Sequence, residues 1–254
     1  AGGRTLKLLY PTHDPQISVL RALYSGKLGN FAQVTPPPLN LKELCTRIAQ
    51  EIENEINRYP LDQREDSRAF GASIESIIKN KWESLCSRLG LRPLGHGGAR
   101  TIYDVAFEYK GYSFGMDIRS KDTDPRKYSD GGVCSIGNLL KFLEKKWFLL
   151  VAEIEHLPNA QDRTKREVRG VLVFPFHCLP MDIYRIQNLG TGQIRFNGTI
   201  SNAYERMEWH RTVGQFLDIL LTKARDHYTK VAEDAVKRRE KVEKDIQRIK
   251  HVWS

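Results

Sequence analysis

Two aspartates in the stretch 101–121 could hold a divalent metal ion. Apolar and polar residues alternate on both sides of Lys110-Gly111, which predicts a β-hairpin with a two-residue turn. Counting outward from that turn places Asp104 directly opposite Asp117. Opposed carboxylates repel each other, so the pair indicates a cation between them, and carboxylate oxygens suit a hard ion such as Mg²⁺. Two unrelated aspartates on a solvated polar face are the alternative interpretation.

The same alternation predicts which face of the hairpin is buried. One face carries the apolar residues Tyr103, Val105, Phe107, Tyr109, Tyr112, Phe114, Met116 and Ile118. Asp104, Asp117 and Arg119 point to the opposite face, because successive side chains of a strand alternate between its two sides. We therefore expect the carboxylates and the arginine to lie together on the polar side of the hairpin.

An aspartate on one strand, followed by Asp-x-Lys or Glu-x-Lys on the next, is the motif of the PD-(D/E)XK nuclease superfamily. The chain resembles this motif at Tyr103-Asp104 and at Asp117-Ile118-Arg119. It is similar in particular to the type II restriction endonucleases of the EcoRV and HincII kind. The segment 71–75 resembles the glycine-to-glutamate segment before the family motif, and the segments 127–132 and 196–199 resemble segments that follow it.

This resemblance implies a fold, an activity and an assembly. The fold is an α/β restriction-endonuclease-like domain, with a mixed β-sheet flanked by helices and a long C-terminal helix. The activity is Mg²⁺-dependent, sequence-specific hydrolysis of double-stranded DNA that leaves blunt ends, as in cytoplasmic restriction-modification, and the assembly is a homodimer. The single domain 1–254 would comprise an N-terminal helical dimerisation region (1–66), a catalytic core (67–180) and a DNA-recognition loop with C-terminal helices (181–254).

The resemblance also assigns roles to single residues. Asp104 and Asp117 would hold Mg²⁺, and Glu75 would support a second ion or its water. Glutamine and asparagine side chains contact adenine in the major groove and arginine contacts guanine. The residues assigned to DNA binding in this way are Gln187, Asn188 and Gln193, with Arg195 and Asn197 nearby, and Lys127. A solvated helical glutamate and an ordinary glycine-rich turn are the alternative interpretations of Glu75 and of the segment 184–199.

The chain departs from the family motif at Arg119, where the family has lysine. Arginine keeps the positive charge, but it does not release a proton near neutral pH and it presents a planar fork. If the family lysine orients water and stabilises charge, Arg119 can serve as a catalytic residue, or Lys121 can reach in from two residues along the same face. If the lysine acts as an acid or base, Arg119 cannot replace it. A DNA-binding protein that no longer cleaves, and a structure-selective nuclease of repair or junction resolution, therefore stay as alternatives.

The composition also points to a polyanionic partner. The chain has 254 residues, a net charge of +9 and an isoelectric point near 9.4. Basic side chains gain affinity for nucleic acid by displacing counterions from phosphates. An acidic membrane surface is the competing interpretation, but neither a basic amphipathic helix with a bulky apolar face nor an apolar run of about 20 residues supports it. The four cysteines are far apart, which is typical of buried free thiols in a reducing compartment and makes a zinc site unlikely.

The elements that must position these residues follow from periodicity and capping signals. We expect helices at 15–24, 39–58, 67–89 and 132–146, one or two long helices over 202–252, a glycine-rich loop at 90–100, and buried central strands at 147–155 and 168–179. The helix 67–89 carries Glu75. A strand, a helix and a further strand indicate a right-handed parallel crossover, so the sheet should combine an antiparallel hairpin with parallel additions.

Overall fold

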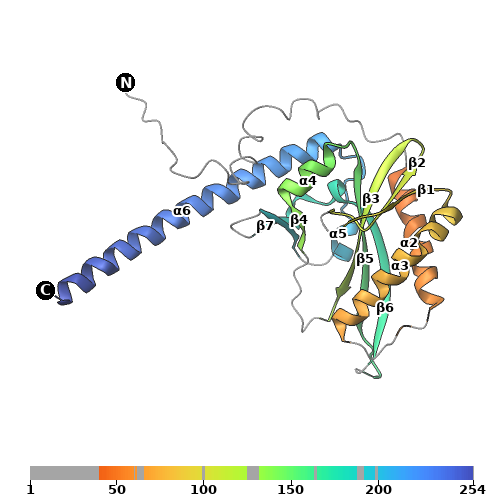
Figure 1. The fold of residues 1–254 in the computed structure, drawn as a ribbon, viewed down its shortest axis with the longest axis horizontal. Helices are drawn as coiled ribbons and strands as arrows, with labels where there is room; N and C mark the ends of the chain where they lie inside the picture. Colours follow the sequence, from red (N-terminus) through yellow and green to blue (C-terminus); the bar gives the residue numbers. More distant parts are fainter. Residues whose placement is uncertain are drawn as a thin grey trace.

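The computed structural model describes residues 40–59, 61, 66–98, 101–124, 132–162, 165–187, 192–197 and 200–253. The helix expected at 15–24, Lys127 and Asn188 lie outside the described residues. The fold is α/β, as the sequence predicts. Figure 1 shows a twisted sheet with helices packed on it, a smaller sheet beside it, and a long C-terminal helix.

The larger sheet is mixed and has five strands in the order β1-β2-β3-β5-β6. Its strands are β1 (Arg92–His96), β2 (Val105–Tyr109), β3 (Tyr112–Asp122), β5 (Phe148–Pro158) and β6 (Arg166–Pro175). β3 and β5 are parallel, as expected, whereas β6 is antiparallel to β5 and lies at the edge of the sheet. The expectation that β6 is a central, parallel strand was therefore wrong. The link between β5 and β6 is too short for the crossover of a dozen or more residues that a parallel pair requires.

The hairpin of β2 and β3 has the register that the alternation predicts. Val105 pairs with Met116, Phe107 with Phe114 and Tyr109 with Tyr112. Lys110 and Gly111 have φ angles of 50° and 79°, and two positive φ angles match the right-handed twist of the strands that they connect. The apolar side chains of β2 and of β3 up to Met116 are buried on the face that the alternation predicts, apart from the half-buried tyrosines next to the turn.

Tyr103 corrects that prediction at one position. Its ring lies against Phe142 and Trp147, and against Gly115 on the opposite face of β3. Strict alternation does not extend to Tyr103 because this residue precedes the first paired residue of β2. The face of the hairpin that the alternation predicts to be polar is therefore covered at Gly115 by the rings of Tyr103 and Phe142.

Helix α3 (Ser67–Leu89) covers the apolar face of the hairpin and has the predicted bounds. The Asp66 carboxylate caps its first turn, and Gly90 ends it with a φ angle of 68°. Trp82 packs on Phe107 and donates its indole N–H to the Ala106 carbonyl at 3.2 Å. One side of α3 therefore packs against the hairpin over successive turns of the helix.

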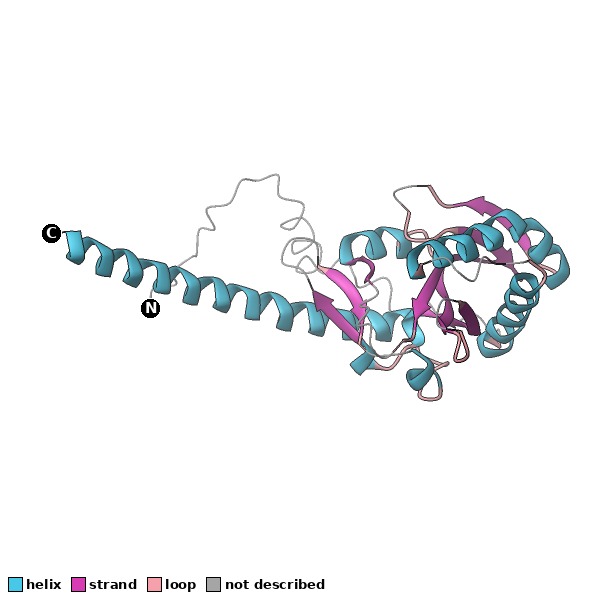
Figure 2. Ribbon diagram, turned by 90° about the horizontal axis from the view of Figure 1, so that it is seen from below, coloured by secondary structure: helices cyan, strands magenta, loops and turns pink. Residues whose placement is uncertain are grey.

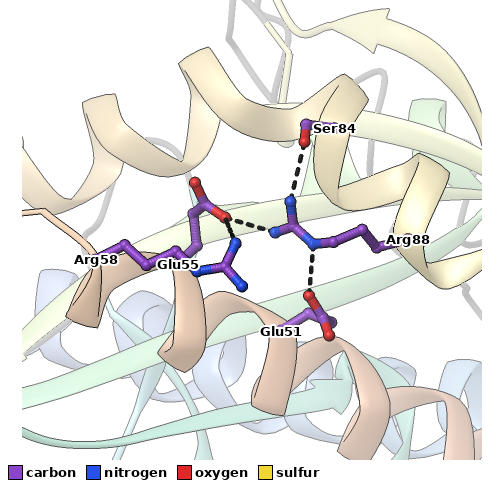
Figure 3. A network of polar contacts seen from close by, with 5 residues as sticks. All are labelled: Glu51, Glu55, Arg58, Ser84 and Arg88. Carbon is purple, nitrogen blue, oxygen red and sulfur yellow. Dashed lines mark hydrogen bonds and ion pairs between the residues drawn. The ribbon is translucent and has the colours of Figure 1, made fainter.

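Helix α2 (Leu41–Asn57) packs beside α3, and Asn40 caps it as expected. Its apolar side chains are buried in the core of its own chain. Figure 3 shows the polar network that joins the two helices: Arg88 of α3 donates to Glu51 (2.8 Å) and Glu55 (2.5 Å) of α2 and to Ser84 (2.9 Å), and Arg58 donates to Glu55 (3.3 Å).

The second sheet is antiparallel and has three strands in the order β4-β8-β7. Its strands are β4 (Gly132–Ser135), β7 (Tyr184–Gln187) and β8 (Gln193–Phe196). The expected helix 132–146 is shorter, because its first four residues pair with β8 as β4 and only Ile136–Leu143 form α4, capped by Ser135. The expected loop 90–100 likewise contains β1, which pairs with β2 through a bulge. Pairing with a distant strand overrides local propensity at both places.

Two helices follow the small sheet: α5 (Ile200–Tyr204) and α6 (Val213–Trp253). α6 is buried at its start, through Ala224, and then extends away from the body of the molecule (Figures 1 and 2). Val242 and Ile249, in the extending part, are 55% and 52% exposed. The part of the chain that the structure describes contains no helix with the length and apolarity needed to cross a membrane. The four cysteines are free and buried, which confirms the prediction made for them.

Candidate active site

The acidic residues gather where β2 stops and β3 continues. The ladder of the hairpin ends with the pair Val105 and Met116, so the next backbone N–H groups of β3 need other acceptors. Asp104 accepts the N–H of Ile118 through Oδ2 at 2.8 Å. The backbone of Ser120 makes a hydrogen bond with the carboxylate of Glu75, which extends from α3. The carboxylates of Asp104 and Glu75 thus bond to the backbone of β3 at the edge that β2 no longer covers.

Asp104 lies beside Asp117, although not in the directly opposed geometry that the register predicted. Its N–H donates to the carbonyl of Met116 at 2.9 Å, and its side chain accepts from Ile118, so Asp104 contacts the backbone on both sides of Asp117. Each aspartate lies one residue beyond Val105 and Met116, which form the last pair of the ladder. The structure therefore brings them together, as the sequence predicts.

The carboxylates influence one another electrostatically. Burial raises the pKa of Asp117 to about 7; Arg119 opposes this shift, and Asp104 and Glu75 add to it. Burial also raises the pKa of Glu75, and the negative charge of Asp104 raises it further. Each shift records mainly the cost of burying a carboxylate, to which the neighbouring negative charges add, and a nearby cation would favour the charged form.

Lys79 is a member of the cluster that sequence reasoning missed. Its Nζ lies 2.7 Å from Oδ1 of Asp104, and the side chains of the two residues are 36% and 24% exposed. Lys79 follows Glu75 by four residues on α3, so the two side chains lie on one face of the helix. This spacing was visible in the sequence, but only the packing of α3 on β3 shows that the face meets Asp104.

Arg119 shares a face of β3 with Asp117, and its guanidinium lies against Glu153 of β5 and Phe196 of the small sheet. Its Nε lies 3.8 Å from Oε2 of Glu153, and its guanidinium carbon lies 5.1 Å from the centre of the Phe196 ring. The Arg119 side chain is 13% exposed and that of Glu153 is 2% exposed. Nη1 of Arg119 and Oε1 of Glu153 are buried without a hydrogen-bond partner. Sequence reasoning missed Glu153, although a glutamate within the apolar run 147–154 was a visible signal.

Lys121 occupies the position expected for it, two residues beyond Arg119 on β3. Its partner in the parallel ladder is Glu155, next to the pair of Arg119 and Glu153. Burial raises the pKa of Glu153, and the charges of Arg119 and Lys121 act against that shift. The β3–β5 pair therefore carries a charged row on the face that also holds Asp117.

The donor set fits a hard divalent ion in kind. Asp104 and Asp117 supply carboxylate oxygens, the ligands that a hard divalent ion prefers. Across the described ranges, however, no group of three or more His, Cys, Asp and Glu side chains is arranged to hold a metal ion. Lys79 already contacts one oxygen of Asp104. A metal ion at Asp104 would therefore compete with Lys79 for that carboxylate.

The residues expected to read DNA lie on the hairpin of β7 and β8. Gln187 pairs with Gln193, and Arg185 pairs with Arg195. Arg185 donates to the Gln187 side-chain oxygen at 3.0 Å, and Arg195 donates to that of Gln193 at 3.1 and 3.3 Å. The opposite face of this hairpin contributes Tyr184, Ile194 and Phe196 to the core. One face of the hairpin thus presents two arginine–glutamine pairs side by side.

Two further observations change the set of residues expected to contact DNA bases. Asn197 is exposed and donates its side-chain N–H to the Asp182 carbonyl at 3.3 Å, so it helps to fix the end of β8. Arg185 was missed by sequence reasoning, although Tyr-Arg-Ile-Gln and Gln-Ile-Arg-Phe are nearly the reverse of each other and place arginine and glutamine on one face of each strand. The candidate DNA-reading residues within the described chain are therefore Arg185, Gln187, Gln193 and Arg195.

Comparison with known proteins assigns the chain to no group. No protein-family model matches it, and no curated protein matches it at a significant level. A functional assignment therefore depends on the chemistry of the two clusters: the carboxylates and cations at the edge of β3, and the arginine–glutamine face of the small sheet.

Proposed function

We propose that the protein is a Mg²⁺-dependent endonuclease that hydrolyses phosphodiester bonds in double-stranded DNA at specific sequences. One observation carries this proposal: Glu75, Asp104 and Asp117 converge with the cations Lys79 and Arg119 at the open end of the hairpin. Carboxylates that hold a divalent ion, next to positive charges that bind a phosphate, are what hydrolysis of a phosphodiester requires. The net charge of +9 supports a polyanionic substrate.

Asp104 and Asp117 would hold the Mg²⁺, which when bound lowers the pKa of a water molecule and neutralises phosphate charge. The protein's own side chains fix the geometry. Asp104 is anchored to the backbone of β3, and Glu75 is fixed by Ser120 while keeping the capacity to accept a hydrogen bond from water. Arg119 lowers the pKa of Asp117, so it favours the charged form of that carboxylate.

The arginine–glutamine face of the β7–β8 hairpin supplies the proposed sequence recognition. A two-stranded ribbon fits the major groove of B-DNA, where arginine pairs with guanine and glutamine with adenine. The arginines hold the glutamine oxygens, so the glutamine side chains are oriented before DNA arrives. Two copies of the chain, related by a two-fold axis, would place one site on each strand, which gives the proposed homodimer.

A second candidate function is DNA binding without cleavage. It is favoured by the position of Arg119, whose guanidinium packs on Phe196 and faces Glu153 instead of the aspartates. In that case the carboxylate cluster would be a remnant, and the basic surface and the β7–β8 hairpin would carry the function.

The test is cleavage of a pool of duplex DNA of random sequence in Mg²⁺, followed by sequencing of the product ends. The proposal predicts ends that share one short sequence, and the family resemblance predicts blunt ends. Cleavage without a shared sequence would indicate a structure-selective nuclease. Retarded but uncut DNA would establish the second candidate function.

A further inference from the structure

Two cations flank the carboxylate cluster, and the structure constrains them differently. Arg119 is nearly buried and lies between Glu153 on β5 and the ring of Phe196 on β8. A guanidinium that packs on an aromatic ring and faces a buried carboxylate cannot turn to a phosphate without taking the largest compensating charge away from Glu153. Arg119 is therefore suited to hold β3, β5 and the small sheet together.

Lys79 has the opposite properties. Its ammonium group is at the end of a flexible four-carbon stem, is 36% exposed and makes an ion pair with Asp104 at 2.7 Å. The positive charge of Lys79 also acts on Asp117 and Glu75, and it lowers the pKa of each. Lys79 thus acts on all three carboxylates. Arg119 also lowers the pKa of Asp117 and Glu75, but the partners of its guanidinium are Glu153 and Phe196.

The ion pair of Lys79 and Asp104 can be exchanged at low cost. A partly exposed ion pair adds little to stability, so a divalent ion that takes the Asp104 oxygen readily displaces the ammonium group. The displaced ammonium remains tethered to α3 beside the ion. A substrate phosphate bound at the two aspartates would then be its nearest strong acceptor.

We propose that Lys79, rather than Arg119, is the cation that contacts the substrate phosphate, and that its ion pair with Asp104 holds it in place until a divalent ion binds. This inference rests on the proposed nuclease function. It assigns to α3 the positive charge that a phosphodiester-hydrolysing site needs, and it gives Arg119 a positioning role through Glu153 and Phe196.

The test compares Lys79→Met and Lys79→Arg with the wild-type protein, and uses Lys81→Met as a matched control. Lys81 lies on the same helix, and its ammonium group lies over the ring of Tyr59, away from the carboxylates. Two quantities are measured: the affinity for Ca²⁺ without DNA, by isothermal titration calorimetry, and the kcat and KM of Mg²⁺-dependent cleavage of duplex DNA.

We expect Lys79→Met to bind Ca²⁺ about two- to fivefold more tightly, because the competing charge at Asp104 is gone. Its kcat should fall about 10²- to 10³-fold with a small change in KM, because a charge that stabilises the transition state is lost. Lys79→Arg should recover part of the kcat, and Lys81→Met should match the wild-type protein. Arg119→Lys should lower the melting temperature, because it weakens the contacts with Glu153 and Phe196.

Contrary results fall into separate classes. Cleavage by Lys79→Met within fivefold of the wild-type rate would overturn the role of Lys79 and leave the proposed nuclease function in place. A wild-type protein that does not cleave any duplex in Mg²⁺ would refute the proposed function. The Ca²⁺ measurement would then still decide whether Lys79 competes with a divalent ion at Asp104, and an unchanged affinity in Lys79→Met would refute that competition.

Discussion

The buried carboxyl group of Asp117 lowers the stability of the folded protein as the pH rises. Its pKa is raised to about 7, mainly because the carboxyl group is buried. Between about pH 4 and pH 7 the folded protein therefore binds more protons at this residue than the unfolded chain does, and the stability contributed by this residue falls as the pH rises through that window. A residue that the fold holds at such a cost is typical of a functional site.

Asp117→Asn should consequently stabilise the protein while removing one of the two carboxylates that we propose to hold the metal ion. At pH 8 we expect the free energy of unfolding to rise by about 1–3 kcal/mol, because the amide carries no charge to bury. At pH 5 the difference from the wild-type protein should be smaller, because Asp117 is then largely protonated. Urea denaturation at the two pH values measures this, and an equal difference at both would contradict the account.

His177, which does not belong to the carboxylate cluster, makes a second pH-dependent contribution to the free energy of unfolding. Burial lowers its pKa to about 4, and the positive charge of Arg211 acts in the same direction. The unfolded chain binds a proton at about pH 6.5, so stability is lost as the pH falls from about 7 toward 4. We expect this residue to account for a loss of about 2–3 kcal/mol between pH 7 and pH 4.5.

The corresponding experiment compares the wild-type protein with His177→Gln, and uses His210→Gln, at an exposed histidine, as the control. His177→Gln should be less stable at pH 7, because the packing against Phe148 is disturbed, but its stability should change less toward pH 4.5. A wild-type profile and a His177→Gln profile that run parallel would show that His177 does not titrate in this range.

At the scale of the elements, the close contact of α3 with β3 positions Glu75 and Lys79. A Cβ atom at Gly71 would lie 2.0 Å from Oγ and 2.9 Å from Cβ of Ser120, so only glycine permits this approach. Gly71→Ala should move the helix away from the strand. We expect a loss of about 1–3 kcal/mol in the free energy of unfolding and, if the nuclease proposal holds, at least a tenfold loss of cleavage.

Gly98→Ala is the matched control, because a Cβ atom at Gly98 would meet open space. Thermal denaturation and a cleavage assay on the same two preparations provide the comparison. Equal stability and equal activity of Gly71→Ala and Gly98→Ala would show that the contact of α3 with β3 does not set the geometry of the site.

The β7–β8 hairpin leads to a prediction about specificity. Arg185→Ala removes a donor that holds Gln187 and, on our proposal, a base contact. We expect it to weaken binding to the cognate sequence by about 1–3 kcal/mol and to change binding to random duplex much less. Electrophoretic mobility shifts in Ca²⁺ with both DNAs measure the two affinities. An equal loss for both would assign Arg185 to the phosphate backbone.

The sequence predicted those elements whose signals are local. The bounds of α3 follow from the Asp66 cap and Gly90, and the hairpin register follows from the alternation around Lys110 and Gly111. β1, with a proline and a glycine among its five residues, carries no strand signal of its own and exists because β2 offers it a partner. The same reasoning applies to β4, which the sequence assigns to a helix.

In the candidate site, too, the sequence predicted the contacts that follow from local patterns and missed the others. The proximity of Asp104 and Asp117 follows from the register, and Glu75 joins them because its helix packs on β3. The contact of Lys79 with Asp104, and that of Arg119 with Glu153 and Phe196, join segments far apart in the sequence. No local pattern encodes those contacts, because they depend on how the helix and the two sheets pack.

At the scale of the whole molecule, α6 combines a buried base with a projecting basic part (Figure 2). The core contacts of α6 include Leu220 and Ala224 and lie before the projecting part, so truncation after Asp234 should change the free energy of unfolding by less than about 1 kcal/mol. If the projecting part contacts DNA phosphates, truncation should reduce the slope of log affinity against log salt concentration. Fluorescence anisotropy titrations at about 50 to 200 mM salt measure this slope. An unchanged slope would exclude the contact of α6 with DNA phosphates.

The most direct test of the central claim is cleavage of plasmid DNA by four proteins, each in Mg²⁺ and in EDTA. The proteins are the wild type, Asp104→Asn, Asp117→Asn and, as a control for charge removal, Asp226→Asn, which alters an exposed residue of α6. The account predicts discrete fragments from the wild type and Asp226→Asn in Mg²⁺ alone, and intact DNA with the other two proteins. Cleavage in EDTA, or cleavage by Asp104→Asn and Asp117→Asn at the wild-type rate, would contradict it.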